Sequence, residues 1–250
     1  MRIALRKNKS ILVCLLAFTM CSMSNAQGFI DLESGIIFTG FNTVRAPGKS
    51  GTSISLKDDL PVKPTPFFRL RVGINFNERH HVSALYAPLT AVAKGSLNTP
   101  VTYRNNTFAA NTELEARYTF NSYRLTYNYS FIQKPKLNLG MGLSAKIRDA
   151  GTFISGGGIT EGNTNIGFVP LINLQLNWMP TEHFGLRVFA DGLVAAQGRA
   201  EDVLVTGIYK VNDKLNLNVG YRFFEGGSDG ASAYNFVLLH YAVAGVTYAF

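Results

Sequence analysis

Four histidines are the side chains best suited to acid–base chemistry in this chain. Such chemistry needs a Ser or a carboxylate within hydrogen-bond reach of the imidazole. His80, His81 and His183 fall at predicted turns, and His240 lies on the apolar face of the last predicted strand. None is predicted at the rim of the long loops with a Ser or carboxylate around it. We therefore predict no catalytic triad or dyad and a protein that is not an enzyme.

Two carboxylate pairs, Asp58-Asp59 and Glu201-Asp202, could bind Ca²⁺, because hard cations prefer clustered oxygen ligands. Both pairs fall in predicted loops, and their spacing matches no recognised metal-binding motif, which favours solvated loop charges. The glycine-rich run 156–162 superficially resembles a phosphate-binding loop. No strand–loop–helix unit surrounds it, so we interpret it as a mobile surface loop. We predict no metal and no cofactor.

Ten charged residues occupy the polar face of segments whose other face is apolar. They are Asp31, Glu33, Arg69, Arg71, Arg124, Lys146, Arg148, Arg187, Asp191 and Arg222. If these segments are strands of a closed barrel, the ten side chains share its lumen. Buried charges are costly unless paired, so one interpretation is a plug of ion pairs. The excess of seven cations over three anions allows a second interpretation, a narrow pore that favours anions.

The segments that carry these charges alternate strictly, as half-exposed strands do. In the clearest example, Tyr123, Leu125 and Tyr127 alternate with Arg124 and Thr126. About ten strands are predicted, at 28–40, 66–76, 80–96, 113–132, 137–148, 166–179, 184–195, 201–211, 215–225 and 234–250. Pro88, Asn121 and Gly207 suggest bulges in three of them.

Aromatic positions and loop lengths favour a membrane barrel over a soluble sandwich. Phe76, Phe131, Trp178 and Phe223 sit at strand ends, as aromatic girdles at a lipid interface would. Short connections (77–79, 133–136, 180–182, 212–214) alternate with mostly longer ones (41–65, 97–112, 149–165, 226–233, and a shorter one at 196–200). The pattern predicts an all-β fold, a closed antiparallel transmembrane up-and-down β-barrel with short periplasmic turns.

The N-terminus has the features of a cleaved signal peptide. A positive region with Arg2, Arg6, Lys7 and Lys9 precedes the apolar run 11–20, and Ser24-Asn25-Ala26 resembles a cleavage site. We therefore assign 1–26 to the signal peptide and 27–250 to the barrel domain. Lipidation at Cys21 is the rival interpretation, but Met20 stands where a small residue is expected.

Removing this leader changes what the rest of the chain can do. Both cysteines, Cys14 and Cys21, leave with it, which excludes disulfides, thiolate metal sites and Cys catalysis. Twenty basic and 16 acidic residues remain, a net charge of +4 with no basic block. This charge does not indicate nucleic-acid binding.

The tail Gly245-Val246-Thr247-Tyr248-Ala249-Phe250 resembles the terminal β-signal of Gram-negative outer-membrane barrels. Gly245, Tyr248 and Phe250 match that pattern, whereas Val243 stands at a polar position. The resemblance implies integral outer-membrane localisation, with outer-membrane lipid and the barrel-assembly machinery as partners. The segment 120–127 looks like a family of small outer-membrane proteins without an assigned activity. A C-terminal helical anchor over 231–250 is the rival, but its β-forming residues favour a strand.

Together these features predict a non-enzymatic outer-membrane barrel with a plugged or narrow polar lumen and surface-exposed loops. Its role would be structural, binding or that of a minor small-solute channel. The alternative is an outer-membrane enzyme acting on lipid A, phospholipid or peptides. The sequence leaves the loop ligand, solute conduction and oligomeric state open.

Overall fold

The computed structural model describes residues 26–196 and 198–250. The predicted signal peptide lies outside this part except for Ala26, and its cleavage stays a prediction. The described residues contain no helix long and apolar enough to cross a membrane.

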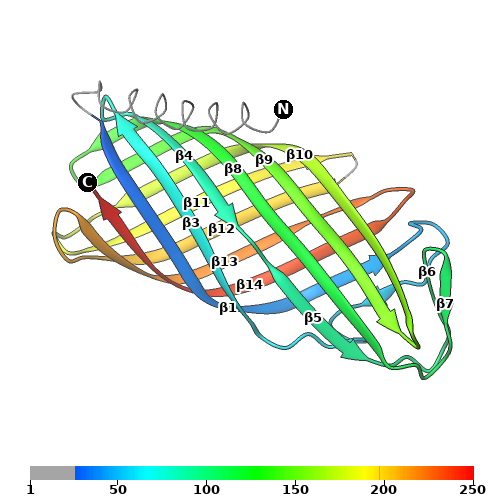
Figure 1. Cartoon of the computed structure of the whole chain (residues 1–250). Coiled ribbons are helices and arrows are strands. Elements are labelled where there is room, and N and C mark those ends of the chain that lie inside the picture. Colours follow the sequence, from blue (N-terminus) through cyan, green and yellow to red (C-terminus); the bar gives the residue numbers. More distant parts are fainter. Residues whose placement is uncertain (1–25, 197) are drawn as a thin grey trace, which may run out of the picture.

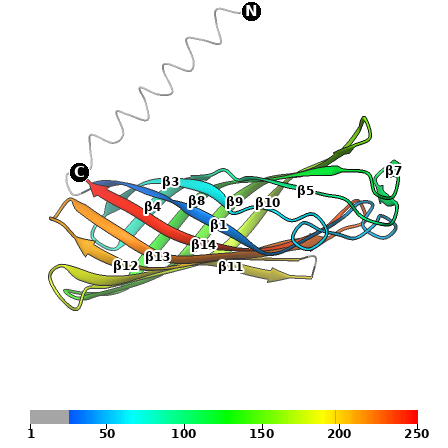
Figure 2. The same ribbon diagram turned by 90° about the horizontal axis from the view of Figure 1, so that it is seen from below.

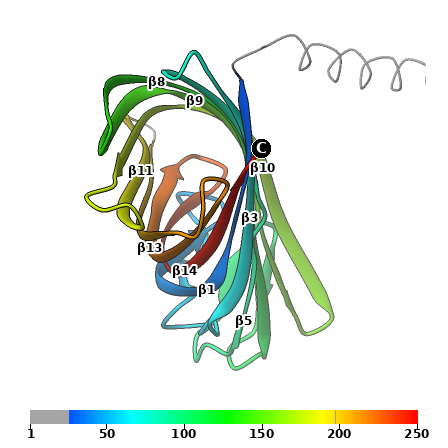
Figure 3. The same ribbon diagram turned by 90° about the vertical axis from the view of Figure 1, so that its left-hand side faces the viewer.

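The chain folds into a closed antiparallel barrel of ten strands, as the sequence predicted (Figures 1 and 3). The wall consists of β1 (Gln27–Arg45), β3 (Thr65–Phe76), β4 (His80–Ala87) continued by β5 (Thr90–Gly95), β8 (Leu114–Lys134), β9 (Leu137–Gly156), β10 (Ile159–Trp178), β11 (Phe184–Ala195), β12 (Gly198–Lys210), β13 (Leu215–Asp229) and β14 (Tyr234–Ala249). Pairing of β14 with β1 closes the ring. Closure leaves no sheet edge between these two strands, as a barrel in lipid requires.

The outer face of the wall is apolar and the inner face polar. On the neighbouring strands β8 and β9, Leu125 is 59% and Leu143 67% exposed, while the adjacent Arg124 and Ser144 are buried. An apolar band this continuous would be unfavourable in contact with water, whereas the hydrocarbon of a membrane favours it. The short turns lie on one side of the barrel, together with the first and last residues of the described wall. By the rule for such barrels, this is the periplasmic end. We call the opposite end the loop end.

Strand interruptions differ from the prediction. Pro88 separates β4 from β5, because proline lacks the N–H that the ladder needs. Asn121 and Gly207 instead pair regularly, so the bulges predicted there are wrong. The register shifts lie at Gly40 in β1 and at Phe131 in β8.

Two predicted long loops are wholly or partly strand. The segment 149–165 forms the outer part of the β9–β10 hairpin, which turns at Gly157 (φ 56°) and Gly158 (φ 79°). A two-residue hairpin turn needs such positive φ values, which glycine adopts without strain. The glycine-rich run therefore makes a tight turn rather than a loop. Similarly, 226–229 continues β13.

The two longest connections lie at the loop end (Figure 2), where their buried side chains pack against inner-face residues of the wall. The first carries the short strand β2 (Ile54–Ser55), and the second the hairpin β6 (Val101–Tyr103) and β7 (Asn106–Phe108). Their apolar side chains form a buried cap: Ile54, Leu56, Leu60, Val101, Tyr103 and Phe108. Burial in this cap raises the pKa of Tyr103 to about 12.

Candidate functional site

The structure places the predicted lumen charges on the inner face of the wall. Arg148 and Arg187 are partly exposed, and the other eight side chains are buried. Alternation along each strand brings them together, since inner-face residues of neighbouring strands lie side by side. They divide into a central cluster, a periplasmic group and a group toward the loop end.

The central cluster joins three arginines to three carboxylates, and we call it the ion-pair layer. It consists of Glu33, Arg69, Arg124, Asp191, Asp202 and Arg222. Arg124 donates to Asp191 Oδ2 (2.7 Å) and to Asp202 Oδ2 (2.5 Å). Arg222 bridges Asp202 and Glu33, with 2.7 Å from its Nη2 to Glu33 Oε2. The charges balance, which is what allows them to remain ionised away from water.

Asp202 is the central carboxylate, and the sequence prediction for it is wrong. The sequence analysis interprets Glu201-Asp202 as solvated loop charges or a Ca²⁺ site, although the strand predicted at 201–211 already includes Asp202. The structure begins β12 at Gly198, which places Asp202 on the inner face, 1% exposed and directly opposite Asp191 on β11. Opposed like charges repel, and Arg124 relieves this by donating to both. The alternation within the predicted strand 201–211, with Val203 and Val205 on the outer face, would have placed this residue in the lumen.

The other carboxylate pair makes local turn contacts. Asp59 accepts from the Ser55 backbone N–H (2.7 Å), and Asp58 accepts from the Ser55 hydroxyl (2.9 Å). Across residues 26–196 and 198–250, no group of three or more His, Cys, Asp or Glu side chains could hold a metal ion.

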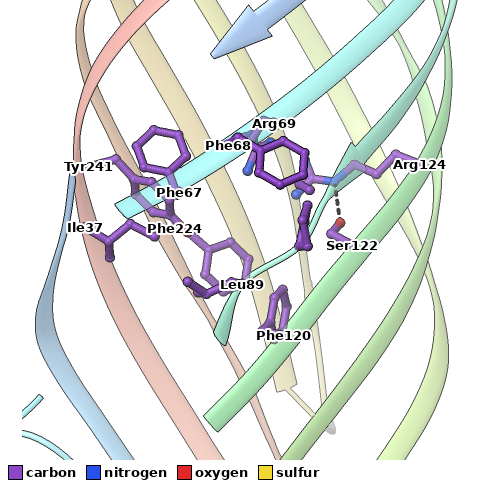
Figure 4. Close-up of a pocket in the computed structure, with 12 residues that line it drawn as sticks. Ile37, Phe67, Phe68, Arg69, Leu89, Phe120, Ser122, Arg124, Phe224 and Tyr241 are labelled. Carbon is purple, nitrogen blue, oxygen red and sulfur yellow. Dashed lines mark hydrogen bonds between the residues drawn. The ribbon is translucent and has the colours of Figure 1, made fainter. Parts of the chain in front are cut away.

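Aromatic side chains fill the lumen next to the ion-pair layer on its loop-end side. Figure 4 shows Phe67, Tyr241, Phe120 and Phe224 gathered beside Arg69 and Arg124. The Phe67 and Tyr241 ring centroids are 5.0 Å apart, and those of Phe120 and Phe224 are 4.8 Å apart. A cavity of about 20 Å³ remains among them, room for about one water molecule.

On the periplasmic side the lumen widens into a polar vestibule of about 350 Å³. Arg187 donates to Asp31 across it (3.2 Å). Arg71 contacts no carboxylate among the described residues; it donates to the Ser83 hydroxyl (3.1 Å) and lies 4.1 Å from the Phe189 ring centroid.

His81 faces this vestibule, and here the sequence analysis missed a serine. His81 Nε2 is 2.7 Å from Ser130 Oγ, and its Nδ1 is 2.7 Å from Asn75 Oδ1. This contact lies at the periplasmic end, away from the rim of the long loops to which the prediction of no triad or dyad refers. Ser130 is fully buried, however, and its hydroxyl also lies 2.8 Å from Asn138 Oδ1, a second acceptor for its single proton. A nucleophile must reach substrate and give its proton to the base, so this geometry favours a structural network.

Toward the loop end, Lys146 and Arg148 contact no carboxylate among the described residues. The Lys146 ammonium lies 4.9 Å from the Phe120 ring centroid and 4.7 Å from that of Phe224. Arg148 donates to the side-chain oxygen of Asn165. Neither cation belongs to the ion-pair layer.

The predicted assembly residues lie at the seam between β14 and β1. Gly245 pairs with Glu33, and Tyr248 with Ile30. Phe250 exchanges two backbone hydrogen bonds of 2.9 Å with Gly28, while its ring is 59% exposed on the outer face. Their recognition by assembly machinery stays a prediction.

Comparison with known proteins finds the same architecture. No family model matches the chain, and no curated protein matches it in sequence. The outer-membrane protease OmpT of Escherichia coli is similar in structure, with a TM-score of 0.51, 13% identity, and coverage of 92% of this chain and 98% of that one. The translocator domain of the autotransporter NalP from Neisseria meningitidis gives a TM-score of 0.45 at 13% identity, with coverage of 98% of this chain and 96% of that one.

The attachment invasion locus protein Ail of Yersinia pestis gives a TM-score of 0.42, 13% identity, and coverage of 89% and 99%. At these identities the likeness concerns the fold. The closed ring, the outward apolar band and the shared fold define the chain as an integral β-barrel of the Gram-negative outer-membrane class.

Proposed function

We propose that the protein is a non-conducting, non-enzymatic barrel whose role is binding at its loop end rather than passage of solutes. The ion-pair layer carries this proposal. It fills the lumen with mutually bonded charged side chains, and the adjoining aromatic rings leave room for about one water. The apolar loop cap is a second barrier.

Two features support the absence of catalysis. The one Ser–His contact described in the lumen engages a buried hydroxyl that also lies against Asn138 Oδ1. The carboxylates of the ion-pair layer are held by arginines and are not free to act as bases.

Conductance in planar bilayers tests the proposal, with variants that remove each barrier separately. Replacing loop residues 48–63 by a Gly/Ser linker of equal length removes much of the cap. Arg124→Ala with Asp191→Ala removes one cation and one anion from the ion-pair layer and keeps it neutral. We expect no current from the wild type or the loop variant, and current when both changes are combined.

Steady current through the wild-type protein contradicts the proposal. Current after loop replacement alone would show that the ion-pair layer is not the barrier. Heat-modifiable migration on gels shows whether each variant is folded.

A further inference from the structure

The barrel wall is interrupted between β10 and β11 toward the loop end. Their pairing stops at Ile172 and Gly192, so residues 159–171 of β10 pair with β9 alone. The last residues of β11 turn away and pair with β12. Figures 1 and 2 show the two strands diverging. Pro170, which has no N–H, lies on the part of β10 that does not pair with β11.

A cavity of about 430 Å³ lies at the divergence. Phe168, Val169 and Leu193 line it at the wall, and Phe120 and Phe224 line it from within. Its volume is in the range of small-molecule sites, and an apolar lining with a few polar groups is typical of them. The Phe168 side chain is 68% exposed toward the surrounding lipid, so the apolar lining continues to the outer surface.

The polar groups of this cavity include two cations without an anion. Lys146 is 1% exposed and lines the cavity, and the described residues offer its ammonium only two aromatic faces. Arg148, also in the lining, has an amide oxygen as its side-chain partner. A buried cation without a counter-ion is costly, and aromatic faces compensate only in part. The site is therefore complementary to an anion.

The depth of the opening follows from strand geometry. On β11, Phe184 near the periplasmic turn is 62% exposed and Val194 is 71% exposed on the same face. Ten residues at about 3.3 Å each, tilted by about 40°, span about 25 Å, the height of the apolar band in such barrels. The opening thus lies where the hydrocarbon of the outer leaflet meets its headgroups.

We propose that this cavity binds a fatty acid anion taken from the outer leaflet. The carboxylate lies at Lys146 and Arg148, and the acyl chain leaves between β10 and β11 past Phe168 and Leu193. One apolar opening at membrane level fits one acyl chain, and the surplus positive charge fits its headgroup. This inference rests on the proposed binding function and names its ligand class.

Binding of radiolabelled laurate to the full-length mature protein in nanodiscs of neutral lipid tests this, with empty nanodiscs as background. Wild type should bind laurate at a single saturable site. Lys146→Met, which keeps the side-chain length, should weaken binding about 10- to 100-fold. Leu193→Trp, which fills the opening without changing charge, should also weaken it. Lys94→Met is the matched control, because Lys94 is exposed and paired with Glu115 (2.9 Å); it should bind as wild type does.

Competitors distinguish the chemistry. Unlabelled laurate should displace the label, whereas dodecanol should do so weakly and inorganic phosphate not at all. The proposal is overturned by absent saturable binding, by wild-type affinity in folded Lys146→Met, or by displacement with phosphate as effective as with laurate. The same preparation fused to planar bilayers separates the two proposals. A silent barrel that binds no laurate refutes this inference alone, and a conducting barrel that binds laurate refutes only the closed lumen.

Discussion

Asp202→Ala is the sharpest test of the ion-pair layer. Asp202 accepts from Arg69 (3.1 Å), Arg124 (2.5 Å) and Arg222, and its side chain is 2% exposed. Its removal leaves three buried arginines facing the two carboxylates Glu33 and Asp191. Breaking a buried pair from one side costs about 3–5 kcal/mol, because a charge is left without compensation. We expect the free energy of unfolding to fall by about that amount.

A second substitution shows whether the loss comes from charge imbalance. Asp202→Ala with Arg222→Ala leaves Arg124 paired with Asp191 at 2.7 Å and Arg69 paired with Glu33 at 3.5 Å. The remaining layer is neutral, so the double variant should lose less than the sum of the single losses, by about 1–3 kcal/mol. If the double variant loses the full sum of the two single losses in unfolding free energy, Asp202 and Arg222 are not energetically coupled and the reasoning is refuted.

The assay is reversible urea unfolding in lipid vesicles, followed by the fluorescence of Trp178. Asp213→Ala is the matched control. Asp213 also pairs with a cation, Lys210 (2.7 Å), but its side chain is 94% exposed, so stability should not change measurably. If folded Asp202→Ala is as stable as this control, the ion-pair layer does not contribute as argued.

Two further predictions concern the lipid face and the seam. Leu143→Arg places a charge on the apolar band and should destabilise the barrel by about 2–4 kcal/mol if residue 143 is near the midplane. The control Val211→Arg, in a periplasmic turn, should not destabilise it. Equal unfolding midpoints for the two variants would reject the membrane placement. Deleting Phe250 removes two 2.9 Å hydrogen bonds to Gly28 and the predicted assembly signal, so less folded protein should reach the outer membrane of cells. Wild-type levels of the truncated protein would refute a role for Phe250 in assembly.

Strand alternation was the part of this fold most readable from sequence. A side chain in a strand has only two directions, so one apolar run such as 123–127 fixes the face of its neighbours. The same rule places Arg124 and Lys146 in the lumen without any knowledge of their contacts. Strand ends were less readable, because polar residues in an outer hairpin resemble those of a loop. That ambiguity made 149–165 a predicted loop, and it made Asp202, the second residue of the predicted strand 201–211, a predicted loop charge.

Contacts across the barrel could not be read from alternation. Arg124 and Asp191 are far apart in sequence and lie on strands that do not pair directly, so their ion pair depends on barrel diameter and tilt. The same holds for His81 and Ser130, which meet because β4 pairs with β8. The local alternation predicts which face of the wall a residue occupies, whereas the closure of the barrel determines which side chain it contacts.

Asp202 changes what the surplus of lumen cations means. With three anions against seven cations, the excess suggested a continuous anion-favouring lining. With Asp202 included, four of the seven lumen cations have carboxylate partners, and the three without one among the described residues are Arg71, Lys146 and Arg148. Arg71 faces the periplasmic vestibule, whereas Lys146 and Arg148 line the cavity at the β10–β11 divergence. A neutral, filled ion-pair layer lies between them, so the surplus charge is split into two separate compartments. Its distribution fits anion binding at the ends of a closed lumen better than selectivity along an open one.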